Sequence, residues 1–133
     1  MASRPPRCDP VVVALRTLIV DDNARFLEAA SDLLEREGIS VVGVASTSDE
    51  ALRRSAELRP DVTLVDVYLG QESGVDLARR LSAPGAPGQS RVILISTYAE
   101  SDFPDLLAAG PALGFVSKAE LSASAIEKVL GSP

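Results

Sequence analysis

Five polar side chains in this sequence stand directly after runs of apolar residues, where buried strands would end. They are the carboxylates of Asp21, Asp22 and Asp66, the hydroxyl of Ser96 and the ammonium of Lys118. Carboxylates that lie together repel one another, and their pKa values rise unless a cation balances the charge. Mg²⁺ prefers oxygen ligands and is usually held by one or two carboxylates together with phosphate oxygens. These residue types therefore predict a site for Mg²⁺-dependent phosphoryl chemistry.

Each of these residues also has an ordinary structural interpretation. An aspartate after a strand is more often a helix N-cap or a turn residue, and this fits Asp21 or Asp22 taken alone. Ser96 alone fits a cap, and Lys118 alone fits a solvated side chain. Asp66 is harder to explain in this way, because it ends an apolar run that looks buried on both faces. Their joint placement at four strand ends is the stronger signal.

Short β-branched runs alternate along the chain with longer segments of helical spacing. The expected strands are residues 15–20, 40–44, 62–65, 91–95 and 114–116, and the expected helices are residues 24–37, 48–58, 75–81, 105–109 and 122–130. Such alternation favours an α/β, doubly wound arrangement, a parallel sheet with right-handed crossovers and helices on both faces. Ligands bind such a sheet beyond the carboxyl ends of its strands. The polar residues that follow the strands would therefore meet at one edge.

Local signals support the boundaries of these elements. Thr47 and Glu50 have the spacing of a capping box, Gly38 stands where a helix would end, and Pro60 would close the second helix. The first residues carry three prolines and little that is apolar, so we expect residues 1–13 to be a disordered tail. Residues 14–131 would form one domain.

The composition narrows the possible functions. The chain has 133 residues, 46% of them hydrophobic, which is enough for one domain with its own core. It contains no histidine, which excludes Ser-His-Asp and Cys-His catalytic sets, and its single cysteine, Cys8, cannot form an internal disulfide. A net charge of −6 argues against direct nucleic-acid binding. No apolar run approaches the roughly 20 residues that cross a bilayer, so we expect a cytoplasmic protein without a membrane partner.

Four separated motifs resemble the receiver domains of two-component response regulators. The motifs are LIVDDN, PDVTLVDVYLGQESG, VILISTYAESD and GFVSKAEL, and the resemblance runs from about Leu15 to Leu130. Gly74 also falls where this family has a glycine that opens its third helix. The resemblance implies a flavodoxin-like fold with a five-stranded parallel sheet, strand order 2-1-3-4-5, and five helices on its two faces.

The resemblance also implies roles for the acidic residues. Asp66 would be the nucleophile that accepts a phosphoryl group from a histidine of a partner sensor kinase, which supplies the imidazole that this chain lacks. Asp22 and Asp66 would bind Mg²⁺ directly and Asp21 through water. The backbone carbonyl of Tyr68 would complete the protein ligands.

Other residues would respond to phosphorylation of Asp66. Lys118 and Ser96 would each bind a phosphoryl oxygen, and Phe115 would turn inward with the Ser96 hydroxyl. This movement would remodel the face of the fourth helix, fifth strand and fifth helix, a candidate homodimer surface. The alternative is that Phe115 is a core ring. Tyr68 and Tyr98 border the approach of water in this family, so two bulky rings would prolong the phosphorylated state, unless they are ordinary, partly exposed rings.

Two positions depart from the common family pattern. Gly70 and Ala119 stand where prolines are frequent in this family. Because residue 119 is alanine and not proline, we expect a trans peptide bond after Lys118. The segments ISTYAESD and SKAEL look most like receivers joined to LuxR-type or NarL-type DNA-binding domains. We therefore expect transcription to be regulated through a C-terminal domain that this chain does not include, the alternative being a stand-alone receiver.

Two further interpretations come from other functional classes. A haloacid-dehalogenase-like phosphatase also uses an aspartate nucleophile and Mg²⁺, but it needs a second aspartate where this chain has Tyr68. A receiver-shaped interaction module that works without phosphorylation would not need the complete set of polar residues. We therefore expect a switch rather than a turnover enzyme, with self-phosphorylation and slow self-hydrolysis only.

Overall fold

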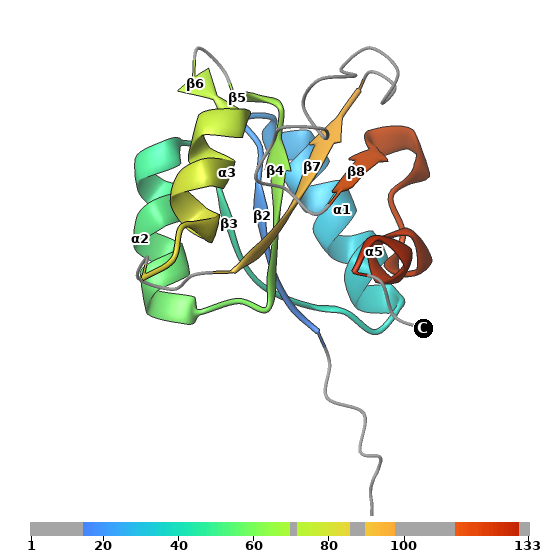
Figure 1. Ribbon diagram of the computed structural model, residues 1–133. Helices are drawn as coiled ribbons and strands as arrows, with labels where there is room; N and C mark the ends of the chain where they lie inside the picture. The colour runs from blue at the N-terminus through green and yellow to red at the C-terminus, as the bar shows by residue number, and fades with distance from the viewer. Residues whose placement is uncertain (1–14, 70–71, 86–89, 98–113, 131–133) are drawn as a thin grey trace, which may run out of the picture.

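A five-stranded parallel sheet forms the centre of the protein. The computed structural model describes residues 15–69, 72–85, 90–97 and 114–130. The strands of the sheet are β2 (Arg16–Val20), β3 (Ser40–Ala45), β4 (Val62–Asp66), β7 (Arg91–Ser96) and β8 (Gly114–Ser117). They lie in the order β3-β2-β4-β7-β8, with each neighbouring pair parallel (Figure 1). The α/β, flavodoxin-like architecture expected from the sequence is therefore present.

The predicted strand order needs one correction. Among the five strands of the sheet, the second along the chain lies at one edge beside the first, as expected. Counted over all strands of the described residues, however, the order is 2-1-3-6-7, because a short hairpin intervenes between β4 and β7. This hairpin pairs β5 (Tyr68–Leu69) with β6 (Glu72–Ser73) in antiparallel fashion. Two-residue strands leave no periodic pattern that a sequence argument could detect.

Four α-helices lie within the described residues. They are α1 (Ala24–Arg36), α2 (Ser48–Leu58), α3 (Gly74–Ser82) and α5 (Ala123–Val129), and a 3₁₀ turn, η2 (Lys118–Glu120), precedes the last. The expected helix at residues 105–109 lies outside the described residues, as does the expected tail at 1–13. The four helices agree with the predicted segments to within one residue at their starts and ends.

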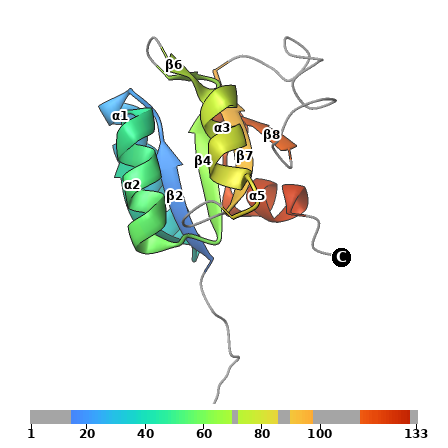
Figure 2. The same cartoon turned by 60° about the vertical axis from the view of Figure 1, so that its left-hand side comes forward.

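Helices cover both faces of the sheet, and each face has its own hydrophobic cluster (Figure 2). On one face, Leu34 of α1 and Ile126 of α5 pack with Ile19 and Leu64 of the sheet. On the other face, Leu77 of α3 and its neighbours from α2 pack with alternate residues of the same strands. The alternation follows from the two-residue period of a strand. Strands buried on both faces explain the nearly continuous apolar runs in the sequence.

Side-chain caps fix the helix ends. The Thr47 hydroxyl accepts a hydrogen bond from the Glu50 N–H, while the Glu50 carboxylate accepts from the Ser46 N–H instead of completing the predicted capping box. Gly38 has a φ of +96°, a left-handed conformation that favours glycine, as expected at the end of α1. The Glu37 carboxylate accepts a hydrogen bond from the Ala123 N–H at 2.6 Å, which joins the end of α1 to the start of α5.

Strand β3 forms one edge of the sheet and contains an irregularity. Thr17 of β2 is opposite Val41, whereas the next residue, Leu18, is opposite Gly43. Val42 is therefore an extra residue in β3, a β-bulge that bends the strand and increases its twist.

Two other expectations concern the peptide bond after Lys118 and membrane-spanning helices. The described residues contain no cis peptide bond, which confirms the trans bond expected after Lys118. Of the helices that the structure describes, none has the length and apolar content needed to cross a bilayer.

Candidate functional site

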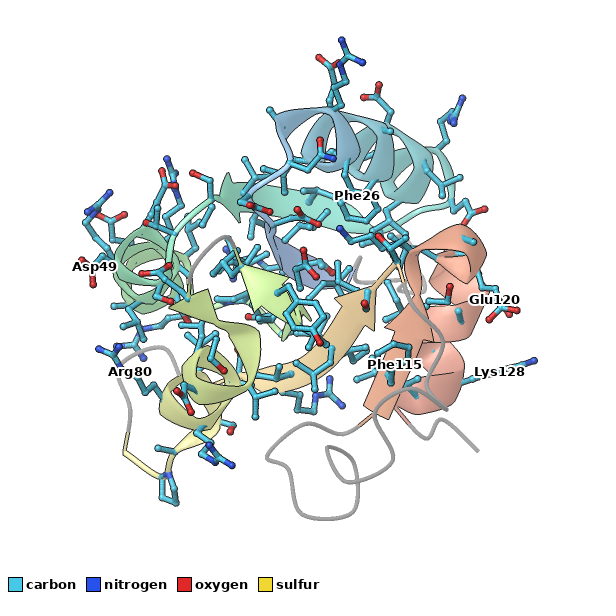
Figure 3. All side chains as sticks on the ribbon, turned by 90° about the horizontal axis from the view of Figure 1, so that it is seen from above. Phe26, Asp49, Arg80, Phe115, Glu120 and Lys128 are labelled. Atoms are coloured by element: carbon cyan, nitrogen blue, oxygen red, sulfur yellow. The ribbon has the colours of Figure 1, made fainter. Side chains whose placement is uncertain are left out.

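The carboxyl ends of β2 and β4 bring two buried aspartates together. The two strands are neighbours, with Val20 opposite Val65. Asp66 is the last residue of β4 and Asp21 follows the last residue of β2, so both carboxylates lie at one edge of the sheet. Asp21 is fully buried and Asp66 retains 6% of its exposure. Figure 3 looks down on this edge.

Lys118 supplies the positive charge of the site. It follows the last residue of β8, and its Nζ lies 2.5 Å from Asp21 Oδ2 and 3.3 Å from Asp66 Oδ2. The lysine side chain is only 16% exposed. The ordinary interpretation of Lys118 as a solvated side chain is therefore wrong.

Backbone turns hold both buried carboxylates in place. Asp21 Oδ1 accepts a hydrogen bond from the Asn23 N–H at 2.8 Å, and Asp66 Oδ1 accepts from the Tyr68 N–H at 3.2 Å. The Asn23 side chain in turn caps α1, accepting from the N–H groups of Arg25 and Phe26. The N-cap of α1 is thus Asn23 and neither Asp21 nor Asp22, whereas the bond to the Asn23 N–H confirms that Asp21 is a turn residue. Its other oxygen, Oδ2, contacts Lys118 in the site.

The electrostatics of the site follow from burial. Burial raises the pKa of Asp66, and the nearby charge of Asp21 raises it further, while Lys118 opposes both effects. For Lys118, burial acts to lower the pKa, but the hydrogen bond to Asp21 and the charges of Asp66 and Asp21 outweigh it and hold the pKa above its usual value. One ammonium therefore does not fully balance the buried negative charge.

The acidic residues fit a divalent cation. Asp21, Asp22 and Asp66 each offer a carboxylate oxygen, and these oxygens lie within 4.8 Å of one another. Two oxygens that bind the same Mg²⁺ directly are at most about 4.2 Å apart. The arrangement therefore fits one cation with direct ligands and ligands bound through water, which is the usual habit of Mg²⁺. A cation bound there would counter the effects of burial and of Asp21 that raise the pKa of Asp66.

A glycine brings α3 against the end of β4. A Cβ atom added to Gly74 would lie 1.8 Å from the carbonyl oxygen of Asp66, and the Gly74 N–H donates a hydrogen bond to the Val67 carbonyl at 3.0 Å. Only a residue without a side chain allows this approach. The glycine noted in the sequence thus fixes the backbone on the C-terminal side of Asp66.

The remaining predicted residues differ in how deeply they are buried. Ser96 is the last residue of β7 and is 1% exposed. Phe115 lies on β8 (Figure 3). It is half-buried and packs against the hydrophobic cluster on the α2 and α3 side of the sheet, called the α2/α3 cluster below. The Tyr68 ring is 57% exposed. Tyr98 lies outside the described residues.

Two residues at the site were not identified from the sequence as part of it. The Phe26 ring lies under the Lys118 ammonium, with Nζ 4.4 Å from the ring centroid. Glu72, on the hairpin, accepts a hydrogen bond from the Ser48 N–H at 2.8 Å and so ties the hairpin to the start of α2. Phe26 looked like a core residue because of its helical spacing. Its place four residues after Asp22, in the first turn of a helix that starts at the site, was the available signal.

The comparisons with known proteins agree on one family. A protein-family model described as "Response regulator receiver domain" matches residues 17–130. The response regulator GacA of Pseudomonas viridiflava is 32% identical over 107 residues, which are 78% of this chain and 48% of that protein. The chain spans about half the length of the curated relatives it matches.

Solved structures show the same similarity. A two-component response regulator of the LuxR family from Aurantimonas sp. SI85-9A1 has a TM-score of 0.76 and 29% identity, covering 89% of this chain and 86% of that one. A Burkholderia pseudomallei response regulator, solved with a phosphorylated aspartic acid, a calcium ion and citrate, has a TM-score of 0.72 and 25% identity, covering 86% of this chain and 65% of that one. With its parallel sheet and its acidic cluster beside a lysine, the chain belongs to the family of response regulator receiver domains.

Proposed function

We propose that this receiver domain accepts a phosphoryl group on Asp66 from a sensor histidine kinase in a Mg²⁺-dependent reaction. The observation that carries the proposal is the position of Lys118, whose ammonium contacts Asp21 and Asp66 beside a cluster of three carboxylates. An ammonium and a divalent cation next to a buried carboxylate are what phosphoryl transfer needs, because catalysis of this reaction is mostly positioning and charge neutralisation.

The proposed step forms an O–P bond to Asp66 and breaks the P–N bond of the donor. An Asp66 carboxylate oxygen attacks phosphorus, the P–N bond to the kinase histidine breaks, and the leaving imidazole takes up a proton. Lys118 and the Ser96 hydroxyl bind the phosphoryl oxygens. Mg²⁺, when bound, would supply further positive charge to the transferring phosphoryl group. Its proposed ligands are Asp22, Asp66, the Tyr68 carbonyl and, through water, Asp21.

The proposed switch follows from the added charge. Phosphorylation adds about 1.5 to 2 negative charges and three acceptor oxygens at Asp66. Ser96, Lys118 and Phe115 respond, and the response reaches the face formed by the fourth helix, β8 and α5, where a second copy of the chain docks. The half-buried state of Phe115 supports this role, because the ring is neither fully packed nor fully solvated.

The proposed output is regulation of transcription. Support comes from the LuxR-family structure and from relatives in which the matched region is about half of the protein. The proposed DNA-binding domain is of LuxR or NarL type and follows the receiver domain. The chain itself turns over no substrate beyond its own phosphorylation and slow hydrolysis. We also propose that residues 14–131 form the folded unit, that residues 1–13 form a tail, and that the protein works in the cytoplasm.

A direct test uses a small-molecule phosphodonor. Incubation with acetyl phosphate and Mg²⁺, followed by intact-mass measurement, is expected to add one phosphoryl group to the wild type. Asp66→Asn is expected to stay unmodified, and chelation of Mg²⁺ is expected to prevent the reaction. Modification of Asp66→Asn to the same extent as the wild type would contradict the assignment of Asp66.

The same experiment separates the alternatives. A receiver that acts as an interaction module without phosphorylation would remain unmodified. The complete set of Asp21, Asp22, Asp66, Ser96 and Lys118 favours the phosphorylated switch over such a module. The hydrolase interpretation loses its basis, because the chain belongs to the receiver family and Tyr68 stands where that hydrolase needs an aspartate.

A further inference from the structure

The ammonium of Lys118 has a neutral partner as well as two charged ones. Besides Asp21 and Asp66, it lies over the ring of Phe26, 4.4 Å from the ring centroid. Phe26 belongs to the first turn of α1, whereas Lys118 follows β8, so the contact joins elements far apart in the sequence. The ring itself packs against the hydrophobic cluster that Leu34 of α1 and Ile126 of α5 form with the sheet, and this packing holds it in place.

The geometry is that of a cation–π interaction. The face of an aromatic ring carries negative electrostatic potential, and a cation within about 6 Å of the centroid is attracted to it. The attraction is stronger where water is excluded, and the Lys118 side chain is only 16% exposed. A neutral ring also does not change its charge when the carboxylates bind a cation or when Asp66 is modified. Cation binding or phosphorylation at the carboxylates therefore leaves the contact between Lys118 and the ring unchanged.

A lysine side chain needs such support to act on a phosphoryl group. Its four-carbon stem has several rotatable bonds, and fixing them costs conformational entropy. If folding already restrains the ammonium beside Asp66, the side chain loses this entropy during folding, and the reaction does not have to order it again. The contact between Phe26 and Lys118 provides such a restraint.

We propose that Phe26 is a positioning residue, whose ring face holds the Lys118 ammonium beside Asp66 so that it meets an incoming phosphoryl group. This role rests on the proposed function, but the contact itself can be tested without it. Phe26→Leu keeps an apolar side chain of similar size and removes the ring, whereas Phe26→Tyr keeps the ring face. These two variants form a matched pair.

The first test observes the unphosphorylated protein by NMR. The ring current of Phe26 is expected to shift the Lys118 Hε protons upfield in the wild type and in Phe26→Tyr, and the shift is expected to disappear in Phe26→Leu. An unchanged Lys118 shift in Phe26→Leu would overturn the contact. Because no phosphodonor is present, this result does not depend on the phosphorylation of Asp66.

The second test measures the rate of phosphorylation by acetyl phosphate. Phe26→Leu is expected to lower the rate about two- to tenfold, the range of a cation–π contact, and Phe26→Tyr is expected to restore it. In a Lys118→Met background, Phe26→Leu is expected to have no further effect, since the ring acts through the ammonium. An equal loss in both backgrounds, or a loss of Mg²⁺ affinity by Phe26→Leu in calorimetry, would overturn the proposal. If the wild type itself is not phosphorylated, the proposed function fails, while the NMR result on the contact stands.

Replacing Phe26 by trifluorophenylalanine keeps the shape of the ring and withdraws electron density from its face. This variant is expected to show the slow phosphorylation of Phe26→Leu while keeping the packing of the wild type. A wild-type rate with the fluorinated ring would show that the ring acts by shape alone and would overturn the electrostatic role.

Discussion

The carboxylate of Asp66 lies beside that of Asp21 at a point where the protein excludes most of the solvent. Because its pKa in the folded protein is raised, the folded state holds a proton that the unfolded chain has already lost over part of the pH range. The stability that this proton contributes is present below the ordinary pKa of an aspartate. It is lost as the pH rises through the raised pKa.

Asp66→Asn should therefore stabilise the metal-free protein near pH 7. The unfolding midpoint in a chelator is expected to rise by a few degrees, the size of an effect of about 1 kcal/mol. The gain should shrink as the pH falls through the raised pKa of Asp66, because the wild-type carboxylate then takes up a proton. Thermal unfolding followed by circular dichroism at several pH values measures this, with Asp32→Asn on the exposed side of α1 as the control. A constant difference at all pH values would contradict it.

Tyr68 allows a prediction on the lifetime of the phosphorylated state. Tyr68 is 57% exposed and its N–H donates to Asp66 Oδ1, so the residue lies beside the acceptor and outside the core. Tyr68→Asn is expected to speed the loss of the phosphoryl group severalfold, because a smaller side chain admits water. Time courses of intact mass after removal of the donor check this. Equal or faster loss in the wild type would refute it.

At the residue scale, the charged groups could be predicted from the sequence, whereas their neutral supports could not. Asp21, Asp66 and Lys118 follow apolar runs, and parallel strands bring such positions to one edge. Phe26 has the spacing of any core residue on a helix, and its contact with Lys118 depends on how α1 packs beside β8. The place of Phe26 in the first turn after Asp22 indicates that it lies near the site, but no local pattern specifies its contact with Lys118.

The junction of β4 and α3 depends on a glycine. Gly74→Ala is expected to lower the free energy of unfolding by about 3 kcal/mol, because its Cβ would collide with the backbone of Asp66, which cannot move aside as a side chain can. Gly43→Ala is the matched control, since its Cβ would meet side-chain atoms and no backbone, the nearest being the flexible end of Leu58 at 2.9 Å. Urea unfolding measures both. Equal losses for the two variants would contradict this account.

The hairpin depends on Glu72. Glu72→Ala removes the acceptor of the Ser48 N–H and is expected to cost about 1 kcal/mol, the usual size of a lost helix cap. Hydrogen exchange of the Ser48 amide should accelerate, and Mg²⁺ should bind more weakly if the Tyr68 carbonyl is a ligand. Glu57→Ala, an exposed residue of α2, is the control with the same change of charge. Unchanged exchange at Ser48 would show that the contact does not hold the hairpin.

At the element scale, the sequence predicted the sheet strands and the four helices of the described residues, because each has several apolar residues at a regular period. The hairpin was missed, since Tyr68–Leu69 and Glu72–Ser73 are too short for any period. Its stability comes from contacts distant in sequence, such as Glu72 with Ser48 and buried Leu69 with the α2/α3 cluster.

At the scale of the whole molecule, three carboxylates gather at one edge of the sheet, and one ammonium contacts two of them. Mg²⁺ at about 100 times its Kd is therefore expected to stabilise the wild type by about 2.7 kcal/mol. Asp22→Asn should remove most of this gain, whereas Asp49→Asn on α2 should retain it. Thermal unfolding with and without Mg²⁺ compares them. An equal gain in both variants would place the cation elsewhere.

The bulge at Val42 has a consequence for how molecules of this protein meet one another. An edge strand rich in valine is a template on which a neighbouring polypeptide can add its own strand, and repeated addition leads to aggregates. The extra residue interrupts the regular spacing of donors and acceptors along that border. The β3 border of the sheet is thereby less suited to the strand-by-strand addition that leads to permanent self-association.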